Sequence, residues 1–304
     1  MTSQAAHEPL ATELPTVAVL GLGTMGHSMA VNSLRAGIPT IVWNRSPEAA
    51  RDLTALGAAT AASAREAVVR ADLVVTMVTD LDAVLDIAVD QGVLDAMAPA
   101  AIWLQMSTIG LGIDHVTRIV ADRRPDVTLV DAPVSGSKGP AEAGTLTIFA
   151  SGPPEALTRA APYFNAVGGR SVWVGPTGQG SRIKLVNNTM LALTAEGVAA
   201  TVALAHRLGV PDETLLEALD DSPLISRWAA AKLRRMANRD FSAEFALALA
   251  LKDVDLALDT LDPLDTDRFL VLRSLAQEWH QAIEHGLGGD DVTVVAQLLE
   301  PATR

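Results

Sequence analysis

Cysteine is absent from this chain of 304 residues. Its absence excludes disulfide bonds, thiolate metal ligands and cysteine nucleophiles together, and it fits a reducing compartment. Basic residues are also few, with 23 Lys and Arg against 36 Asp and Glu and a formal net charge of −13. Nucleic acid and anionic membranes need a positive surface, so neither is expected as a general partner. Any anionic substrate must be held by local cations.

Long uninterrupted apolar runs are missing as well. Residues 1–15 lack a basic start followed by an apolar segment, so we expect a disordered tail there and no secretory signal. The most apolar later window, 185–205, contains Asn187, Asn188 and Glu196, which would be costly in lipid, so no membrane span is expected. With 49% hydrophobic residues the chain can build real cores, and we expect a cytoplasmic globular protein.

Residues 17–26 read VAVLGLGTMG, and residues 30–34 after them are compatible with a helix. An apolar run, a glycine-rich turn and a helix in this order are typical of a dinucleotide site. Gly21 would make the tight turn, Gly23 would let the backbone approach the pyrophosphate, and Gly26 would allow close packing of helix on strand. N–H groups in the first turn of the helix would face the phosphates. The predicted cofactor residues of this segment are Gly21, Leu22, Gly23, Thr24, Met25 and Gly26.

The second apolar run, 39–43, is followed by Asn44, Arg45 and Ser46. An acidic residue near this position would hold a ribose 2′-hydroxyl, and it would repel a 2′-phosphate. A guanidinium and two small polar side chains would instead hydrogen-bond that phosphate. We therefore predict NADP(H) over NAD(H), the alternative being that Arg45 is an ordinary solvated loop charge.

The hydrophobic pattern divides the chain near residue 178. Before it, short apolar runs recur between helix-like segments, at 16–20, 39–43, 72–78, 101–106, 127–132, 145–150 and 171–174. They predict a parallel-dominated sheet with crossover helices. After it, helical patterns occupy 180–208, 212–220, 224–237, 243–261, 267–285 and 290–299.

The predicted fold is therefore α/β, with a Rossmann-type dinucleotide-binding domain at 16–177 and an all-α domain at 178–304, joined by a long interdomain helix. At 1.5 Å per residue that helix would be about 45 Å long, too long for one small domain to bury. The Ala- and Leu-rich helical half suggests assembly into a homodimer, although a well-filled core would explain the same composition.

A turn dense in small polar residues follows the predicted strand 127–132. It can direct backbone N–H groups and the hydroxyls of Ser135 and Ser137 into one concavity, which suits a carboxylate. Its glycines and prolines could equally make a plain turn.

Two lysines stand in apolar helical stripes. Lys184 and Asn188 are four residues apart and share one helix face with Leu191 and Ala195. The ammonium could donate a proton to a carbonyl oxygen as hydride arrives at carbon, with Asn188 orienting lysine or substrate. The alternative is a lysine whose stem crosses apolar surface to reach water.

Lys252 is the second such cation. It could pair with Asp253 or Asp255 at the surface, or it could reach the site and neutralise the substrate anion.

These blocks together resemble the β-hydroxyacid dehydrogenase family over nearly the whole chain after residue 15. The shared blocks are 21–26, 131–136, the pair Gly178 and Gly180 with Lys184 and Asn188, and Lys252 with Asp253. Segments 43–46 and 135–142 look most like the glyoxylate and succinic semialdehyde reductases, which use NADPH.

The resemblance implies roles for individual residues. Lys184 would be the catalytic acid/base and Asn188 would position. Ser135, Gly136 and Ser137 would hold the substrate carboxylate, and Lys252 would bind substrate at the domain interface. Met77, Val78 and Thr79 would lie along the cofactor and Thr108 near the nicotinamide. No metal is implied, and the subunits would form dimers or tetramers through the helical domain.

Two segments depart from the family pattern. Residues 290–294, DDVTV, replace an Asp followed by a small hydroxyl residue and alanine, which puts a family contact with the site in doubt. Trp228 lies where the second domain could wall the substrate pocket, and its indole could admit substrates other than small semialdehydes.

Two other functions fit the same architecture. Imine reductases share an Asn-Arg-Ser cofactor signature, but they usually carry Asp or Tyr where Lys184 stands and lack the Ser-Gly-Ser turn. A non-catalytic NADP-binding interaction module is the other alternative, and the joint presence of Lys184, Asn188 and Lys252 argues against it.

Overall fold

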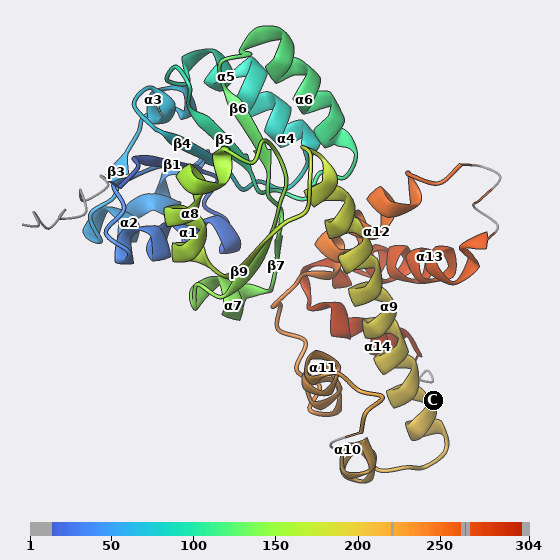
Figure 1. The fold of residues 1–304 in the computed structure, drawn as a ribbon. Coiled ribbons are helices and arrows are strands. Elements are labelled where there is room, and N and C mark those ends of the chain that lie inside the picture. The colour runs from blue at the N-terminus through green and yellow to red at the C-terminus, as the bar shows by residue number, and fades with distance from the viewer. Residues whose placement is uncertain (1–13, 220–221, 263–264, 266–267, 300–304) are drawn as a thin grey trace, which may run out of the picture.

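The computed structural model describes residues 14–219, 222–262, 265 and 268–299, so most of the tail expected at 1–15 lies outside the described residues. A six-stranded, fully parallel sheet in the order β3-β2-β1-β4-β5-β6 forms the centre of the N-terminal domain (Figure 1). Its strands are β1 (Val17–Leu20), β2 (Thr40–Trp43), β3 (Ala59–Thr60), β4 (Leu73–Thr76), β5 (Ile102–Gln105) and β6 (Thr128–Asp131). The strand order reverses between β1 and β4, as in a Rossmann fold.

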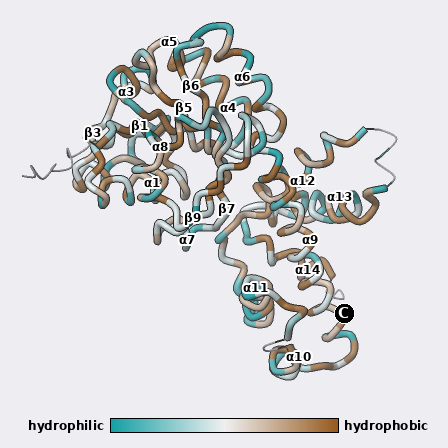
Figure 2. Tube along the Cα trace, viewed as in Figure 1, coloured by the Kyte–Doolittle hydropathy of each residue, from teal (hydrophilic) through white to brown (hydrophobic). Residues whose placement is uncertain are grey.

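Both faces of this sheet are covered by helices, which is why β1, β4 and β5 are mainly apolar and buried along their whole length (Figure 2). Val17 and Val19 of β1 face one core layer, and Ala18 and Leu20 face the other. The first layer is completed by α1 (Thr24–Arg35), α2 (Arg51–Ala55) and α8 (Ala156–Val167). The second is completed by α3 (Ala64–Val68), α4 (Leu81–Leu85), α5 (Val93–Ala96) and α6 (Gly112–Arg123).

The apolar runs at 145–150 and 171–174 do not extend the parallel sheet, contrary to the sequence expectation. They form a separate three-stranded sheet of β7 (Val134–Ser135), β8 (Leu146–Ala150) and β9 (Gly168–Trp173). The chain turns back after β6 and runs through the short helix α7 (Lys138–Glu142), so β7 pairs antiparallel with β8. An isolated antiparallel bridge between Asp131 and Ser151 joins the two sheets.

The long helix α9 (Gln179–Arg207) leads from this domain into the helical one (Figure 1). The predicted fold class is thereby confirmed. The first turn of α9 is packed so tightly on the sheet that a Cβ at Gly180 would lie 2.3 Å from the Phe149 carbonyl oxygen. The buried Asp131 carboxylate accepts hydrogen bonds from the Ser181 N–H and hydroxyl, both at 2.7 Å. Burial raises the pKa of Asp131, and the Ser181 hydrogen bonds act against that rise.

The helical domain packs around α9. Its helices are α10 (Asp212–Leu219), α11 (Arg227–Ala237), α12 (Leu247–Leu258), α13 (Leu270–Glu284) and α14 (Ala296–Leu299). Two predicted helices are shorter than expected. The segment 243–246 is not helical, and 290–299 contains only a 3-10 turn (Val292–Val295) and α14, because Asp291 forms a bridge with Ala246 instead.

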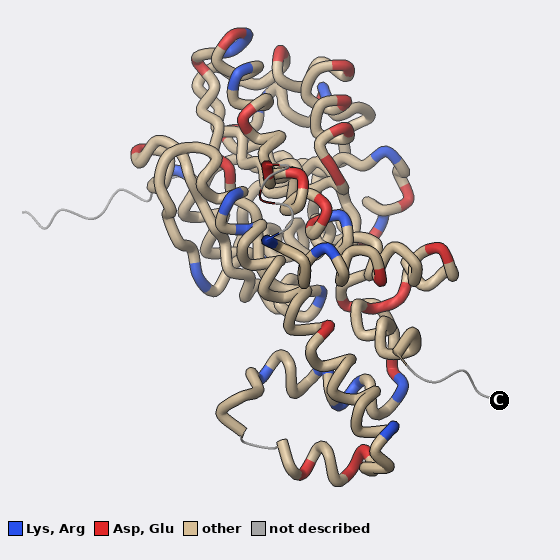
Figure 3. Tube along the Cα trace, turned by 90° about the vertical axis from the view of Figure 1, so that its right-hand side faces the viewer, with Lys and Arg blue, Asp and Glu red and all other residues tan. Residues whose placement is uncertain are grey.

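Charged residues are distributed over both domains, and one helix is both long and apolar. Lys and Arg are scattered among more numerous Asp and Glu residues over the described parts of both domains (Figure 3). By length and composition, α9 is the single helix among the described residues that could cross a membrane. This is weak support for a span, since α9 also packs against α11, α12 and β8.

We predict that Asp131→Ala lowers the free energy of unfolding by about 1–3 kcal/mol, because two buried donors of Ser181 lose their acceptor. Asp131→Asn should cost less, since it keeps one acceptor oxygen and removes a buried charge. Urea unfolding measures both, with exposed Asp122→Ala as the control. Equal midpoints for Asp131→Ala and the control would contradict this role.

Candidate functional site

A cavity of about 470 Å³ lies between the two domains, at the carboxyl ends of β1, β4 and β5 and against α12. This is where a Rossmann sheet binds its ligand, beside the reversal of strand order. Most of the predicted site residues line it: Gly21, Gly23, Thr24, Met25, Gly26, Asn44, Arg45, Ser46, Met77, Val78, Thr79, Thr108, Gly136, Ser137, Lys184 and Lys252. Four do not, namely Leu22, Ser135, Asn188 and Trp228.

The three glycines of the first turn meet three different demands. Gly21 has a positive φ of 98°, and a Cβ there would lie 2.4 Å from the Met77 carbonyl oxygen. A Cβ at Gly26 would lie 2.0 Å from the Gly21 carbonyl oxygen. A Cβ at Gly23 would meet nothing within 4 Å, so the backbone there is open to a ligand. Helix α1 also begins without a side-chain cap, which leaves its first N–H groups for phosphate oxygens.

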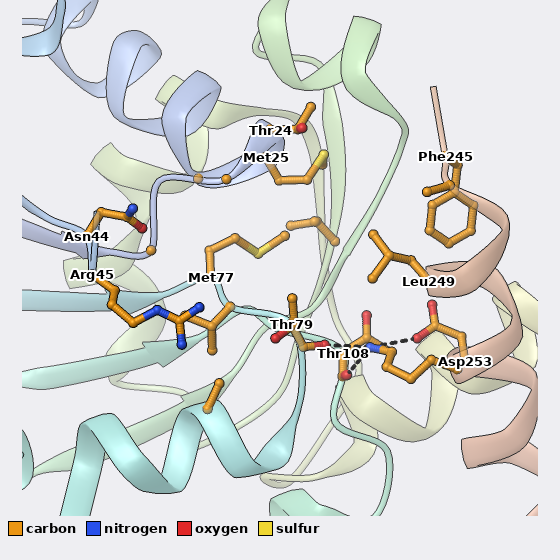
Figure 4. A pocket seen from close by; sticks show the side chains of 18 of the residues that line it. Thr24, Met25, Asn44, Arg45, Met77, Thr79, Thr108, Phe245, Leu249 and Asp253 are labelled. Atoms are coloured by element: carbon orange, nitrogen blue, oxygen red, sulfur yellow. Dashed lines mark hydrogen bonds and ion pairs between the residues drawn. The ribbon is translucent and has the colours of Figure 1, made fainter. Parts of the chain in front are cut away.

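In the segment after β2, Asn44 supports the glycine turn and Arg45 is exposed to solvent. Asn44 accepts a hydrogen bond from the Leu22 N–H at 2.9 Å and donates to the Ser46 carbonyl at 3.1 Å, so it braces the glycine turn. Leu22 takes part only through this backbone contact and packs into the core. Arg45 is exposed, makes no hydrogen bond or ion pair with another described residue, and extends along the cavity (Figure 4).

A buried polar network supports the cofactor side of the cavity from behind. Gln105 accepts from the Ser107 N–H at 2.8 Å and donates to the Ser107 carbonyl at 2.9 Å. The Ser107 hydroxyl accepts from the Val78 N–H at 2.9 Å. Thr76 joins the same network through Gln105. Gln105 and Ser107 escaped the sequence analysis because nothing in their local pattern shows this pairing across strands.

Lys184 brings a buried amine to the cavity from the second turn of α9. Only 8% of the residue is exposed, and its Nζ forms no hydrogen bond with the described residues. Burial lowers the pKa of Lys184 to about 8; the charge of Lys252 acts in the same direction and that of Asp253 opposes it. An amine with this pKa can gain or lose a proton near neutral pH.

Asn188 and Lys252 connect the elements around this amine. The buried Asn188 amide donates to the Asp253 carboxylate at 2.5 Å, which ties α9 to α12. Lys252 crosses the domain interface and donates to the carbonyls of Thr79 and Thr108, both at 2.8 Å (Figure 4). It forms an ion pair with Asp253 at 3.1 Å, without hydrogen-bond geometry. Of the two predicted partners, Asp255 pairs with His280 instead.

The turn after β6 contributes its backbone and one serine. Gly136 has a φ of 133°, and Ser137 precedes α7 at the cavity edge. Ser135 instead turns its hydroxyl toward α9, where it accepts from the Asn187 amide at 3.2 Å. Of the two predicted serines of this turn, Ser137 therefore lines the cavity and Ser135 does not.

Trp228 does not form the expected wall of the substrate pocket in this chain. It packs against the helical core, and its ring lies 5.6 Å from the Lys232 Nζ, a cation–π contact. The wall is formed instead by residues 243–246 and by Leu249 of α12 (Figure 4). Helical spacing could have found Leu249 and Asp253, which share a face with Lys252, whereas Phe245 precedes the helix.

The arrangement fits a nicotinamide dinucleotide and a small substrate. The glycine turn is open at Gly23, the uncapped α1 faces it, and Arg45 is available to an anionic group. The described residues contain no cluster of three His, Asp or Glu side chains suited to a metal ion.

Known proteins were compared with the chain. The NAD binding domain of 6-phosphogluconate dehydrogenase matches residues 16–175, and the NAD-binding domain of NADP-dependent 3-hydroxyisobutyrate dehydrogenase matches residues 178–299. The NAD-dependent L-serine dehydrogenase of Pseudomonas aeruginosa is 33% identical over 294 residues, which is 94% of this chain and 98% of that protein. Glyoxylate/succinic semialdehyde reductase 1 of Arabidopsis thaliana is 29% identical over 289 residues, which is 93% of this chain and 98% of that protein.

Solved structures give the same picture. The Mycobacterium tuberculosis 3-hydroxyisobutyrate dehydrogenase with L-serine has a TM-score of 0.82 at 29% identity, covering 95% of this chain and all of that one. An imine reductase from Myxococcus stipitatus with NADP+ has a TM-score of 0.65 at 21% identity over 94% of this chain and all of that one. At this identity the likeness concerns the fold alone.

Proposed function

Because the chain belongs to the β-hydroxyacid dehydrogenase family, we propose that it is an NADP(H)-dependent oxidoreductase of small aldehydes or keto acids and their hydroxyacids. The substrate would be of the glyoxylate or succinic semialdehyde type. The observation that carries the proposal is Lys184, a buried amine at the cavity with a pKa lowered to about 8. An imine reductase remains the alternative on this fold, and this lysine is the feature that disfavours it.

Lys184 performs the proton transfer in this mechanism. A bound nicotinamide dinucleotide would supply the hydride in reduction and accept it in oxidation. As an ammonium, Lys184 gives its proton to the carbonyl oxygen, and as an amine it takes the proton of the hydroxyl in the reverse direction. Gly136 and Ser137 line the cavity and would receive the substrate carboxylate.

Asn188 keeps the positioning role that the family resemblance implies, whereas Lys252 acts differently from its implied role. Asn188 does not line the cavity and acts through its hydrogen bonds with Asp253 and Asn187, so it is a positioning residue. Lys252 donates hydrogen bonds to the carbonyls of Thr79 and Thr108, and its charge is paired with that of Asp253. In this arrangement Lys252 fixes the two domains relative to each other, and it contributes positive charge to the cavity rather than a free donor.

The cofactor would be held along the edge of the sheet. Residues 21–26 would receive the pyrophosphate and residues 44–46 the ribose, while residues 77–79 and Thr108 would lie beside the nicotinamide. The preference for NADP(H) rests on Arg45, an exposed cation at the cavity with no partner among the described residues.

We also propose that two copies assemble along α9 in the cytoplasm. One stripe of the helix is apolar and exposed, with Val186 at 69%, Met190 at 67% and Leu204 at 57% exposure, and with Ile183 and Leu208 at its ends. Gly197 lies on the same stripe, and a Cβ there would meet nothing within 4 Å. A glycine inside a helix costs roughly 1 kcal/mol relative to alanine. A second helix that approaches this close would explain both the glycine and the exposed stripe.

We predict that Lys184→Met lowers the turnover number at least ~100-fold and leaves the Kd for NADPH unchanged, because only the proton donor is lost. In the unsubstituted enzyme the ammonium form is present below its pKa of about 8, so kcat/KM for reduction should fall as the pH rises through that value. For oxidation it should rise over the same range. The assays follow NADPH absorbance with glyoxylate, succinic semialdehyde and a cyclic imine. Near-normal turnover of Lys184→Met would remove the residue from this role.

Arg45→Asp should raise the Kd for NADPH by about 10–100-fold and change that for NADH little, because a charge-assisted bond to the 2′-phosphate becomes a repulsion. Fluorescence titration measures both constants. Exposed Arg51→Asp, outside the cavity lining, is the matched control. If the ratio of the Kd for NADPH to the Kd for NADH is unchanged in Arg45→Asp, the role of Arg45 in binding the 2′-phosphate is refuted.

Assembly along α9 should be abolished by Val186→Glu combined with Met190→Glu, because four carboxylates would be buried at a two-fold interface. Light scattering after size-exclusion chromatography gives the mass, and Leu157→Glu on α8 serves as the control. A monomeric unsubstituted chain, or a doubly substituted chain that still assembles, would refute this interface.

A further inference from the structure

An ion cluster outside the cavity holds the part of its wall that we call the wall loop, residues 241–246. The loop contributes Ala243, Glu244, Phe245 and Ala246 to the cavity lining, and it has no helix of its own. Its conformation must therefore come from contacts with other parts of the chain.

Asp291 supplies most of these contacts. Its side chain is fully buried, and one carboxylate oxygen accepts the N–H groups of Glu244 and Phe245, both at 3.1 Å. Its own N–H donates to the Phe241 carbonyl at 2.8 Å, and the Val292 N–H donates to the Phe245 carbonyl at 3.0 Å. The wall loop is thus hydrogen-bonded to Asp291 and Val292, which belong to the segment 290–294 that departs from the family pattern.

Lys232 of α11 is the counterion of this arrangement. Only 2% of it is exposed, and its Nζ donates to both Asp291 oxygens, at 2.9 and 3.1 Å, and to Glu244 Oε2 at 2.9 Å. The hydrogen bonds from Lys232 and from the loop outweigh the effect of burial and hold the pKa of Asp291 below its ordinary value. Asp291 is therefore ionised at neutral pH.

Arg235, one turn further along α11, contacts the same loop. Its guanidinium lies 3.1 Å from Glu244 Oε2 and also donates to the Ser242 carbonyl. Two cations from one helix thus hold the loop through Glu244 and Asp291. This set of contacts spans three segments that are distant in sequence.

Resting on the proposed function, we infer that Lys232 and Asp291 are positioning residues for the substrate. They act through the wall loop and set where Phe245 stands against the cavity. The cofactor half of the cavity is built on the other domain, from residues 21–26, 44–46 and 77–79. Loosening the wall loop should therefore weaken the binding of substrate and not that of NADPH.

Three variants separate positioning from stability. Lys232→Met leaves Asp291 buried without its counterion, which is destabilising as well as disruptive to the loop. Asp291→Asn keeps one acceptor oxygen for the N–H groups of Glu244, Phe245 and Thr293. The double variant Lys232→Met with Asp291→Asn removes both charges, so it should recover stability while the loop stays loose. Exposed Arg227→Met on the same helix is the matched control.

We expect KM for the aldehyde substrate to rise about 10-fold or more in all three variants, because small displacements at a reacting site are costly. The turnover number should stay within about threefold, and the Kd for NADPH should be unchanged. Amide hydrogen exchange of residues 244 and 245 should accelerate, while α12 remains protected. The double variant should unfold at a higher urea concentration than Lys232→Met and keep the raised KM.

The inference is overturned if KM and exchange of the wall loop match those of Arg227→Met. It is equally overturned if the double variant restores KM together with stability, since the cluster would then be structural only. Absence of turnover by the unsubstituted enzyme on every aldehyde would count against the proposed function. The exchange measurement needs no substrate and still decides whether the cluster holds the loop.

Discussion

The anchorage of α9 on Asp131 is the contact on which the site depends. The carboxylate holds Ser181 at the start of the helix, and Lys184 follows three residues later. Gly180 lets the helix come this close to the strand ends. The position of the amine relative to the glycine turn is therefore set by the end of β6, through one buried carboxylate and less than one turn of helix.

Two further connections fix the cavity between the domains. Lys252 joins α12 to the segments after β4 and β5, and Asn188 joins α9 to α12 through Asp253. The same side chains also govern the amine, because the charges of Asp253 and Lys252 act on Lys184 in opposite directions. Geometry and proton affinity are thus controlled by one small group of residues.

The features that sequence analysis found are those with a local cause. The parallel strands are apolar runs because both faces are buried, the glycines are required by contacts within one turn, and the lysines stand out in helical stripes. These signals sufficed for the fold class and for most of the cavity lining.

The features that it missed depend on contacts between distant segments. Residues 243–246 continue an apolar pattern that predicts helix, but Asp291 and Asp290 take their backbone into a bridge. The second sheet forms because the chain turns back after β6, and apolar runs alone do not indicate that the chain reverses there. Trp228 is expected from the sequence to wall the pocket from the second domain, whereas in the structure it packs against the helical core.

Under the proposed function, the burial of Lys184 links the charge of the substrate to the protonation of the Lys184 amine. Burial disfavours the ammonium form of Lys184, the charge of Asp253 opposes this effect, and the charge of Lys252 adds to it. A substrate carboxylate would add a second negative charge to that of Asp253, and the amine would then hold its proton more strongly. In the proposed mechanism, binding of the anionic substrate and protonation of Lys184 would thus be coupled, so that the substrate itself would favour the form of the side chain that donates the proton.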